Sequence, residues 1–118
     1  MGSSQSPSNC RPEVEEIIRR HKCVVFSATY CPYCDRAKTV LGKMKVSPLV
    51  IELDQHPRGK DYRQALKEIT NQTTVPNIFI GEAHIGGCSD LIAGIKKGTV
   101  QQHFSRAGVE YHDVVNEI

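Results

Sequence analysis

Two cysteines separated by two residues stand between an apolar run and a helical pattern, and this junction constrains the fold more than any other part of the chain. The motif is Cys31-Pro32-Tyr33-Cys34. The run before it, residues 23–28, predicts a buried strand, and apolar residues at helical spacing predict a helix over about 32–44. Cys31 is therefore expected at a helix N-terminus, where the helix dipole favours a thiolate. Because the thiolate is the nucleophile of disulfide exchange, the motif predicts redox chemistry at Cys31.

The composition of the chain excludes several other classes of protein. Its 118 residues suffice for one domain with a hydrophobic core, and its net charge of +2 is too small to suggest nucleic-acid binding. No apolar run approaches the ~20 residues of a membrane-spanning helix, and no signal-peptide core is present, so we expect a cytoplasmic protein. Five cysteines at irregular spacing do not form a secreted disulfide framework. Structural zinc would need two more suitably spaced ligands, so we expect no metal.

The chain divides into an arm, a domain and a tail. Residues 1–11 are small and polar, and they predict a disordered arm. The first six match the N-myristoylation pattern with Gly2 as acceptor, which would give a weak anchor; a plain polar tail is the alternative. Residues 12–108 carry the domain, and 109–118 are interpreted as an appended tail.

Helices and strands alternate within the domain. The predicted helices cover about 12–22, 32–44, 60–70, 89–97 and 99–107. The predicted strands cover 23–28, 49–53, 75–80 and 83–85. A helical connection makes the first two strands parallel, and the two-residue turn Gly81-Glu82 makes the last two a hairpin. The expected fold is α/β, with one four-stranded mixed sheet flanked by about five helices.

The two cysteines of the motif are expected to have different roles. Cys31 should be the exposed member, and Cys34, one turn into the helix, the protected one. Cys31 would attack a substrate disulfide, and Cys34 would release the product by closing the Cys31–Cys34 bond. Pro32 fits because the first N–H groups of a helix have no partner within it. A packing role for both thiols is the alternative.

Two later segments have the features of a binding site. Thr74-Val75-Pro76 precedes a strand, and a cis bond there would turn the Val75 N–H and C=O toward an extended peptide-like ligand; a trans bond is the alternative. Gly86-Gly87-Cys88-Ser89-Asp90 combines two glycines with a helix N-terminus, which favours a carboxylate or phosphate. Asp90 could bind an amino group, so this segment fits the α-amino acid end of a ligand. Simple N-capping by Ser89 or Asp90 is the alternative.

These three segments, in this order, resemble the glutaredoxin family, and the Cys-Pro-Tyr-Cys motif resembles its dithiol class. The resemblance covers about residues 13–107 and implies a thioredoxin-like fold with glutathione as co-substrate. It also implies reduction of glutathione–protein mixed disulfides and of protein disulfides. The expected partners are therefore glutathione and glutathionylated or disulfide-containing proteins, and the chain is expected to be a monomer.

The resemblance also implies a role for individual residues. Cys31 would be the nucleophile and Cys34 the resolving thiol. The residues implied to bind glutathione are Tyr33, Arg63, Thr74, Val75, Pro76, Gly87, Cys88, Ser89 and Asp90. Within this set, Val75 would pair with the cysteinyl part, the segment ending at Asp90 would hold the γ-glutamyl end, and Arg63 would face the glycyl carboxylate.

One position departs from the family pattern. Ala28 stands where glutaredoxins usually carry a lysine that pairs with the glycyl carboxylate and adds positive potential near the thiolate. Its loss is expected to weaken glutathione binding or to lower the thiolate fraction of Cys31, with Arg63 and Lys60 compensating. Because an exposed charge pair contributes only ~0–1 kcal/mol, we expect a tuned enzyme rather than an inactive one.

The sequence is also compatible with two other functions. A [2Fe–2S] cluster could be shared across a dimer by Cys31 and two glutathiones, although Pro32 disfavours it, and a non-catalytic redox adaptor could dock partners through Val75 and Pro76.

The three cysteines outside the motif are expected to differ in their surroundings and reactivity. Cys23 should be a core residue. Cys88 could be oxidised or glutathionylated beside the glutathione site, and Cys10, in the arm, could form an intermolecular disulfide.

Overall fold

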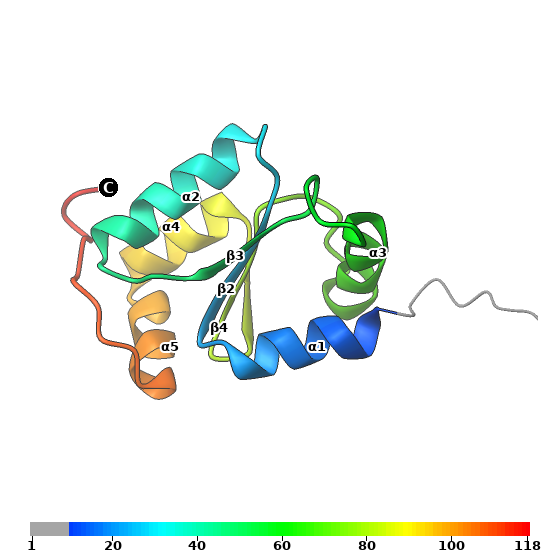
Figure 1. Ribbon diagram of the computed structural model, residues 1–118. Helices are drawn as coiled ribbons and strands as arrows, with labels where there is room; N and C mark the ends of the chain where they lie inside the picture. The colour runs from blue at the N-terminus through cyan, green and yellow to red at the C-terminus, as the bar shows by residue number, and fades with distance from the viewer. Residues whose placement is uncertain (1–9) are drawn as a thin grey trace, which may run out of the picture.

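The computed structural model describes residues 10–118, so the predicted acylation site at Gly2 lies outside the described residues. The elements are α1 (Arg11–Arg20), β2 (Cys23–Ser27), α2 (Pro32–Lys43), β3 (Leu49–Glu52), α3 (Gly59–Thr70), β4 (Asn77–Ile80), β5 (Ala83–Gly86), α4 (Cys88–Lys97) and α5 (Thr99–Ala107) (Figure 1). Every predicted helix and strand is present, with ends that differ by at most two residues. None of the helices within residues 10–118 has the length and apolar character needed to cross a lipid bilayer.

The four strands form one mixed sheet in the order β3-β2-β4-β5. β2 is parallel to β3 and antiparallel to β4, and β4 is antiparallel to β5. Gly81 and Glu82 both have positive φ angles, 54° and 73°, as the tight turn of the β4–β5 hairpin requires. With helices on both faces, the fold is thioredoxin-like, and the expected fold class is confirmed.

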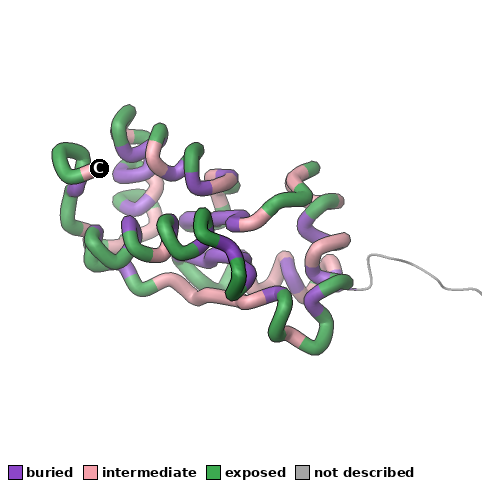
Figure 2. Tube along the Cα trace, turned by 90° about the horizontal axis from the view of Figure 1, so that it is seen from above, coloured by how far each residue is buried: buried purple, intermediate pink, exposed green. Residues whose placement is uncertain are grey.

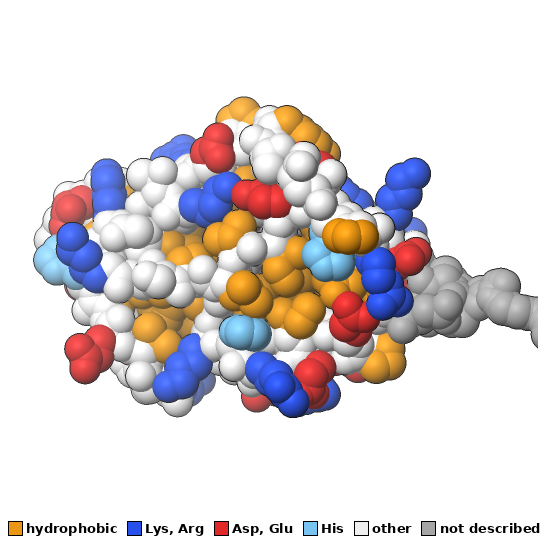
Figure 3. All heavy atoms as spheres, in the orientation of Figure 1, with side chains coloured by type: hydrophobic (Ala, Val, Ile, Leu, Met, Phe, Trp, Pro, Cys, Tyr) orange, Lys and Arg blue, Asp and Glu red, His pale blue; other side chains and the backbone are white. Residues whose placement is uncertain are grey.

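The alternation of side chains along β2 divides the core between the two faces of the sheet. Val24 and Phe26 pack with α1 and α3, whereas Cys23 and Val25 pack with α2, α4 and α5. Figure 1 shows these two groups of helices on opposite sides of the strands, and in Figure 2 the buried stretches lie between them. The face drawn in Figure 3 carries Lys and Arg interspersed with Asp and Glu, in keeping with the small net charge.

Two expectations about the chain ends are wrong. Cys10 is fully buried against Val14, whose N–H donates to the Cys10 carbonyl at 2.9 Å, and α1 begins at Arg11, so the arm does not extend to these two residues. A buried Cys10 thiol is also not placed for an intermolecular disulfide. Residues 109–118 are not an appendage, because Val114 is fully buried in the core beside α2 and α5, and the N–H of His112 donates to Met44 O at 2.7 Å. Val109, Tyr111 and Ile118 also pack against this core, although the segment forms neither a helix nor a strand.

Candidate active site

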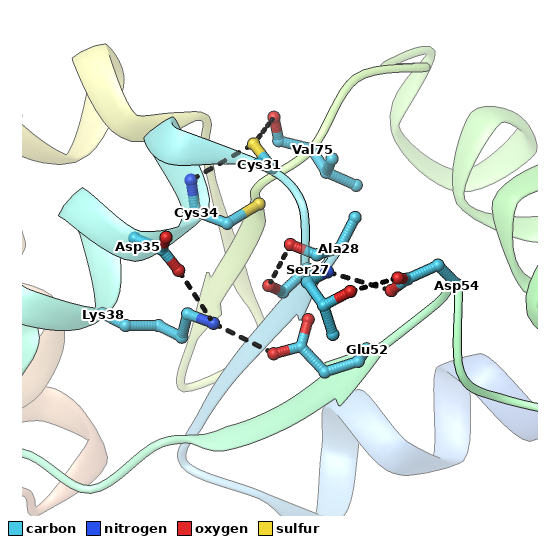
Figure 4. A network of polar contacts seen from close by, with 10 residues as sticks. Ser27, Ala28, Cys31, Cys34, Asp35, Lys38, Glu52, Asp54 and Val75 are labelled. Carbon is cyan, nitrogen blue, oxygen red and sulfur yellow. Dashed lines mark hydrogen bonds and ion pairs between the residues drawn. The ribbon is translucent and has the colours of Figure 1, made fainter.

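The two sulfurs of the motif lie at the N-terminus of α2 (Figure 4). Cys31 is the N-cap residue, and its Sγ accepts a hydrogen bond from the Cys34 N–H at 3.3 Å. Both cysteines are free thiols. The predicted order of exposure is confirmed, since Cys34 is fully buried and Cys31 is not, but Cys31 exposes only 9% of its surface. Little of Cys31 is therefore open to solvent.

The Cys34 thiol is held in its protonated form. Burial raises the pKa of Cys34 well above its ordinary value, and the hydrogen bond with Cys31 raises it further. At neutral pH only the thiol of Cys34 is present, so it does not compete with Cys31 for a substrate disulfide. Cys34 therefore suits a second, resolving step better than the first attack.

The loop before β4 lies directly against Cys31. The Val75–Pro76 bond is cis, as one of the two interpretations predicted. The Val75 carbonyl accepts from the Cys31 thiol at 3.7 Å rather than facing outward, and within residues 10–118 the Val75 N–H has no partner. Gln72, which the sequence analysis did not single out, braces this loop by donating from Nε2 to the carbonyls of Thr74 and Pro76, both at 3.0 Å.

The N-terminus of α4 forms the second wall of the site. Its N-cap is Gly87, whose N–H donates to Asp90 Oδ2 at 2.8 Å. Neither Ser89 nor Asp90 is therefore the N-cap residue that the alternative interpretation proposed, but Asp90 satisfies the N–H of the N-cap from the first turn of the helix. Gly86 has a φ of +113°, and a Cβ there would lie 2.4 Å from the same Asp90 oxygen, so glycine is required. Cys88 is buried, and burial raises the pKa of its thiol, which does not support a reactive Cys88.

A hollow of about 570 Å³ joins these walls. Its lining includes every residue predicted to bind glutathione except Arg63, and adds Gln72. The lining residues are Tyr33, Gln72, Thr74, Val75, Pro76, Gly87, Cys88, Ser89 and Asp90. Segments separated by up to 57 positions in the chain thus meet beside Cys31, which is what an extended ligand with a sulfur in its middle requires.

Arg63 lies on the other side of Val75. It lines a separate hollow of about 610 Å³ together with Lys60, and its Nη2 lies 3.3 Å from the Tyr30 hydroxyl. A small cleft connects Arg63 with Thr74 and Val75. Ala28, at the position of the missing lysine, is fully buried, and the positive charges that line this hollow are Arg58, Lys60 and Arg63.

Side chains behind the site hold α2 and the Cys31 loop in place (Figure 4). Lys38 Nζ lies 2.9 Å from Glu52 Oε2 on β3, and 3.6 Å from Asp35 Oδ1. Asp54 accepts from both the N–H and the hydroxyl of Thr29, and these hydrogen bonds lower the pKa of Asp54. The only sign of these contacts in the sequence is a set of charged residues at the ends of an apolar strand.

Comparison with known proteins places the site in a family. The family model described as Glutaredoxin matches residues 23–85. Glutaredoxin-1 of Rhizophagus irregularis is 41% identical over 95 residues, covering 80% of this chain and 94% of that protein. A glutaredoxin of Ricinus communis is 41% identical over 96 residues, covering 81% and 94%.

Solved structures agree with these matches. A buckwheat glutaredoxin–glutathione complex aligns with a TM-score of 0.86 at 32% identity, covering 92% of this chain and 99% of that chain. A wheat glutaredoxin aligns with a TM-score of 0.83 at 39% identity, covering 89% and 99%. The chain therefore belongs to the glutaredoxin family, and it is a thiol–disulfide oxidoreductase.

Proposed function

We propose that this chain reduces mixed disulfides between glutathione and proteins, and also protein disulfides, with Cys31 as the nucleophile and Cys34 as the resolving thiol. The observation that carries the proposal is the position of Cys31 Sγ, which caps α2 and lies 3.7 Å from the carbonyl oxygen of Val75, one of the residues that line the 570 Å³ hollow. The helix N-terminus stabilises the sulfur anion, and the hollow has the size and polar groups for a peptide. The relative from buckwheat is described as a glutathione complex, which supports this choice of ligand.

In the first step, the Cys31 thiolate attacks the glutathione sulfur of a protein–glutathione disulfide. The S–S bond breaks, the protein thiolate leaves and takes up a proton, and a Cys31–glutathione disulfide forms. A second glutathione thiolate then attacks this bond, so that Cys31 is released as a thiolate and oxidised glutathione leaves. In net terms the mixed disulfide and one reduced glutathione become the protein thiol and oxidised glutathione, so the second glutathione is the reductant.

Protein disulfides require Cys34. After Cys31 has formed a mixed disulfide with one sulfur of the substrate, Cys34 loses its proton and attacks Cys31 Sγ. The bond between Cys31 and the substrate sulfur breaks, the Cys31–Cys34 disulfide closes, and the substrate leaves as a dithiol after its sulfurs take up protons. This attack is intramolecular, because Cys31 caps α2 and Cys34 lies in the first turn of the same helix, and this favours it over attack by a thiol from solution. Two glutathiones then reduce the enzyme again.

Two parts of glutathione would bind in the hollow, and the glycyl part would reach the neighbouring one. The Val75 N–H, which has no partner within residues 10–118, would pair with the cysteinyl carbonyl, and the N-terminus of α4 with Ser89 would bind the γ-glutamyl carboxylate. Asp90 keeps one carboxylate oxygen free for the amino group. The glycyl carboxylate would extend toward Arg63 and Lys60, which take over from the lysine that Ala28 replaces.

Single cysteine substitutions test the proposal. Cys31→Ser is expected to abolish turnover of every disulfide, whereas Cys34→Ser is expected to retain reduction of a small glutathione mixed disulfide and to lose most reduction of a disulfide-bonded protein. Cys10→Ala removes a buried thiol on the opposite face of the sheet and serves as control, with both activities unchanged.

Three results would contradict the proposal. Residual turnover by Cys31→Ser would exclude Cys31 as the only nucleophile. Binding of protein disulfides without turnover by the wild type would favour the adaptor function. Visible absorbance from a bound cluster after anaerobic purification, with no disulfide turnover, would favour the [2Fe–2S] function.

A further inference from the structure

A second hollow lies next to the glutathione-binding hollow, between α2 and α4, which pack side by side (Figure 1). Its volume is about 370 Å³. We call it the α2–α4 groove, and its lining residues are Tyr33, Arg36, Cys88, Ser89, Ile92, Ala93 and Lys96. The proposed reaction with glutathione uses neither helix beyond its first turn, so the far part of this groove has no role in it.

The surface of the groove combines apolar and positively charged groups. Ile92, Ala93 and the ring of Tyr33, which is 67% exposed, supply most of the apolar surface. The charged lining residues are Arg36 and Lys96, both exposed and neither in an ion pair within residues 10–118. No acidic side chain is part of the lining. The groove is therefore complementary to an apolar side chain flanked by carboxylates.

The groove is continuous with the reactive site. Tyr33, Cys88 and Ser89 line both hollows, so the groove begins where a disulfide at Cys31 would lie. When glutathione fills the first hollow, the protein to which it is joined must leave the site along a neighbouring surface. The α2–α4 groove is such a surface, and it can contact the residues that flank the modified cysteine.

We propose that the α2–α4 groove docks the polypeptide around the reactive cysteine of a protein substrate and favours segments that combine an apolar side chain with Asp or Glu. The proposal rests on the proposed function and adds a substrate class to it. Exposed Arg36 and Lys96 would attract acidic segments before contact and pair with their carboxylates after it. Two exposed charge pairs together correspond to about a tenfold preference.

Synthetic peptides that carry one glutathionylated cysteine test this docking. One peptide places Leu and two Glu residues beside the cysteine, the second replaces Glu by Lys, and the third replaces Leu by Ser in the acidic peptide. The measured quantity is kcat/KM for deglutathionylation of each peptide. The mixed disulfide of glutathione and free cysteine, which has no flanking polypeptide, reports on the proposed function separately.

The wild type is expected to prefer the acidic over the basic peptide by about tenfold at low salt, and less as salt screens the charges. The double variant Arg36→Glu/Lys96→Glu should reverse this preference. The double variant Lys43→Glu/Lys97→Glu is the matched control, because both lysines are exposed on the same two helices outside the groove, and it should keep the preference.

Separate outcomes would overturn separate parts of the proposal. Equal kcat/KM for the acidic and basic peptides in the wild type, or an equal change in both double variants, would exclude charge selection by the groove. Equal kcat/KM for the Leu and Ser peptides would exclude the apolar contact. Failure with the free-cysteine mixed disulfide would instead contradict the proposed function.

Discussion

The N-termini of α2 and α4 lie at the same hollow, yet their first turns are built in opposite ways. α2 begins on Cys31, whose sulfur itself accepts the helix N–H of Cys34 at 3.3 Å. α4 begins on Gly87, whose own N–H is satisfied by Asp90 from inside the helix at 2.8 Å. Under the proposed function, the first helix would stabilise a side chain that reacts, and the second would hold a backbone surface against which the ligand lies. The dipole of a helix would thus serve chemistry at α2 and binding at α4.

The largest expected difference between the N-termini of α2 and α4 is in the reactivity of their thiols. Alkylation by iodoacetamide at neutral pH should modify Cys31 at least about tenfold faster than Cys34 or Cys88, because the thiolate is the reactive form and burial raises the pKa of Cys34 and of Cys88. The rates at Cys34 and Cys88 should rise as the pH passes 9, since their thiolates form only there. Peptide mapping after timed labelling measures the three rates. Fast labelling of Cys88 at neutral pH would show that the α4 end is reactive as well.

Gly86→Ala should disturb the N-terminus of α4 and leave the N-terminus of α2 unchanged. The added Cβ would meet Asp90 Oδ2 at 2.4 Å in a backbone with φ of +113°, so we expect a loss of about 2 kcal/mol in the free energy of unfolding. The KM for a small glutathione mixed disulfide should rise as the cap is displaced. Urea unfolding and steady-state kinetics measure the two effects.

Gly42→Ala is the matched control for this change. A Cβ at Gly42, inside α2, meets nothing within 4 Å, so alanine there should stabilise the protein by about 0.5–1 kcal/mol. A similar loss of stability in Gly86→Ala and Gly42→Ala would mean that the close contact between Gly86 and Asp90 does not hold the N-terminus of α4 in place.

Asp90→Ala should have a smaller effect on the same end. Removing the cap leaves the Gly87 N–H without its partner, which costs about 1 kcal/mol, and removes a group placed for the γ-glutamyl amine, so KM should rise. Asp35→Ala removes the acidic residue from the first turn of α2, where Cys31 is the cap, and should cost less than about 0.5 kcal/mol with KM unchanged. Equal losses of stability in Asp90→Ala and Asp35→Ala would mean that the first turns of α4 and α2 do not differ in the way described.

Cys31→Ser should have the smallest effect on stability and a complete effect on activity. Serine is a favoured N-cap, and its hydroxyl can accept the Cys34 N–H, so the free energy of unfolding should stay within about 0.5 kcal/mol of the wild type or rise. Thermal and urea unfolding of the reduced proteins test this. A loss above about 2 kcal/mol would mean that the Cys31 sulfur holds the site together rather than serving the reaction.

Local patterns in the sequence were sufficient for much of this arrangement. The apolar run before Cys31 and the helical spacing after it placed the thiol at a helix start, and the two glycines before Cys88 placed the second start. Each of these inferences depends on neighbours in the chain, and the structure agrees with both.

The features that were missed depend on residues far apart in the chain. Cys10 was assigned to the arm because its polar surroundings hide the contact with the α1–α3 side of the core. Val114 is buried by helices that end before it, and Lys38 finds Glu52 on a strand 14 positions later. Gln72 follows the end of α3 and reads locally as part of a turn, so its hydrogen bonds across the cis-proline loop could not be predicted.

The most direct test of the central claim is to trap the first covalent intermediate. The Cys34→Ser protein, incubated with oxidised glutathione and analysed by intact mass and peptide mapping, should carry one glutathione per chain, attached to Cys31. The adduct should disappear on addition of reduced glutathione. A glutathione attached to Cys88 or Cys23 instead, or no adduct at all, would contradict the assignment of Cys31 as the nucleophile at this hollow.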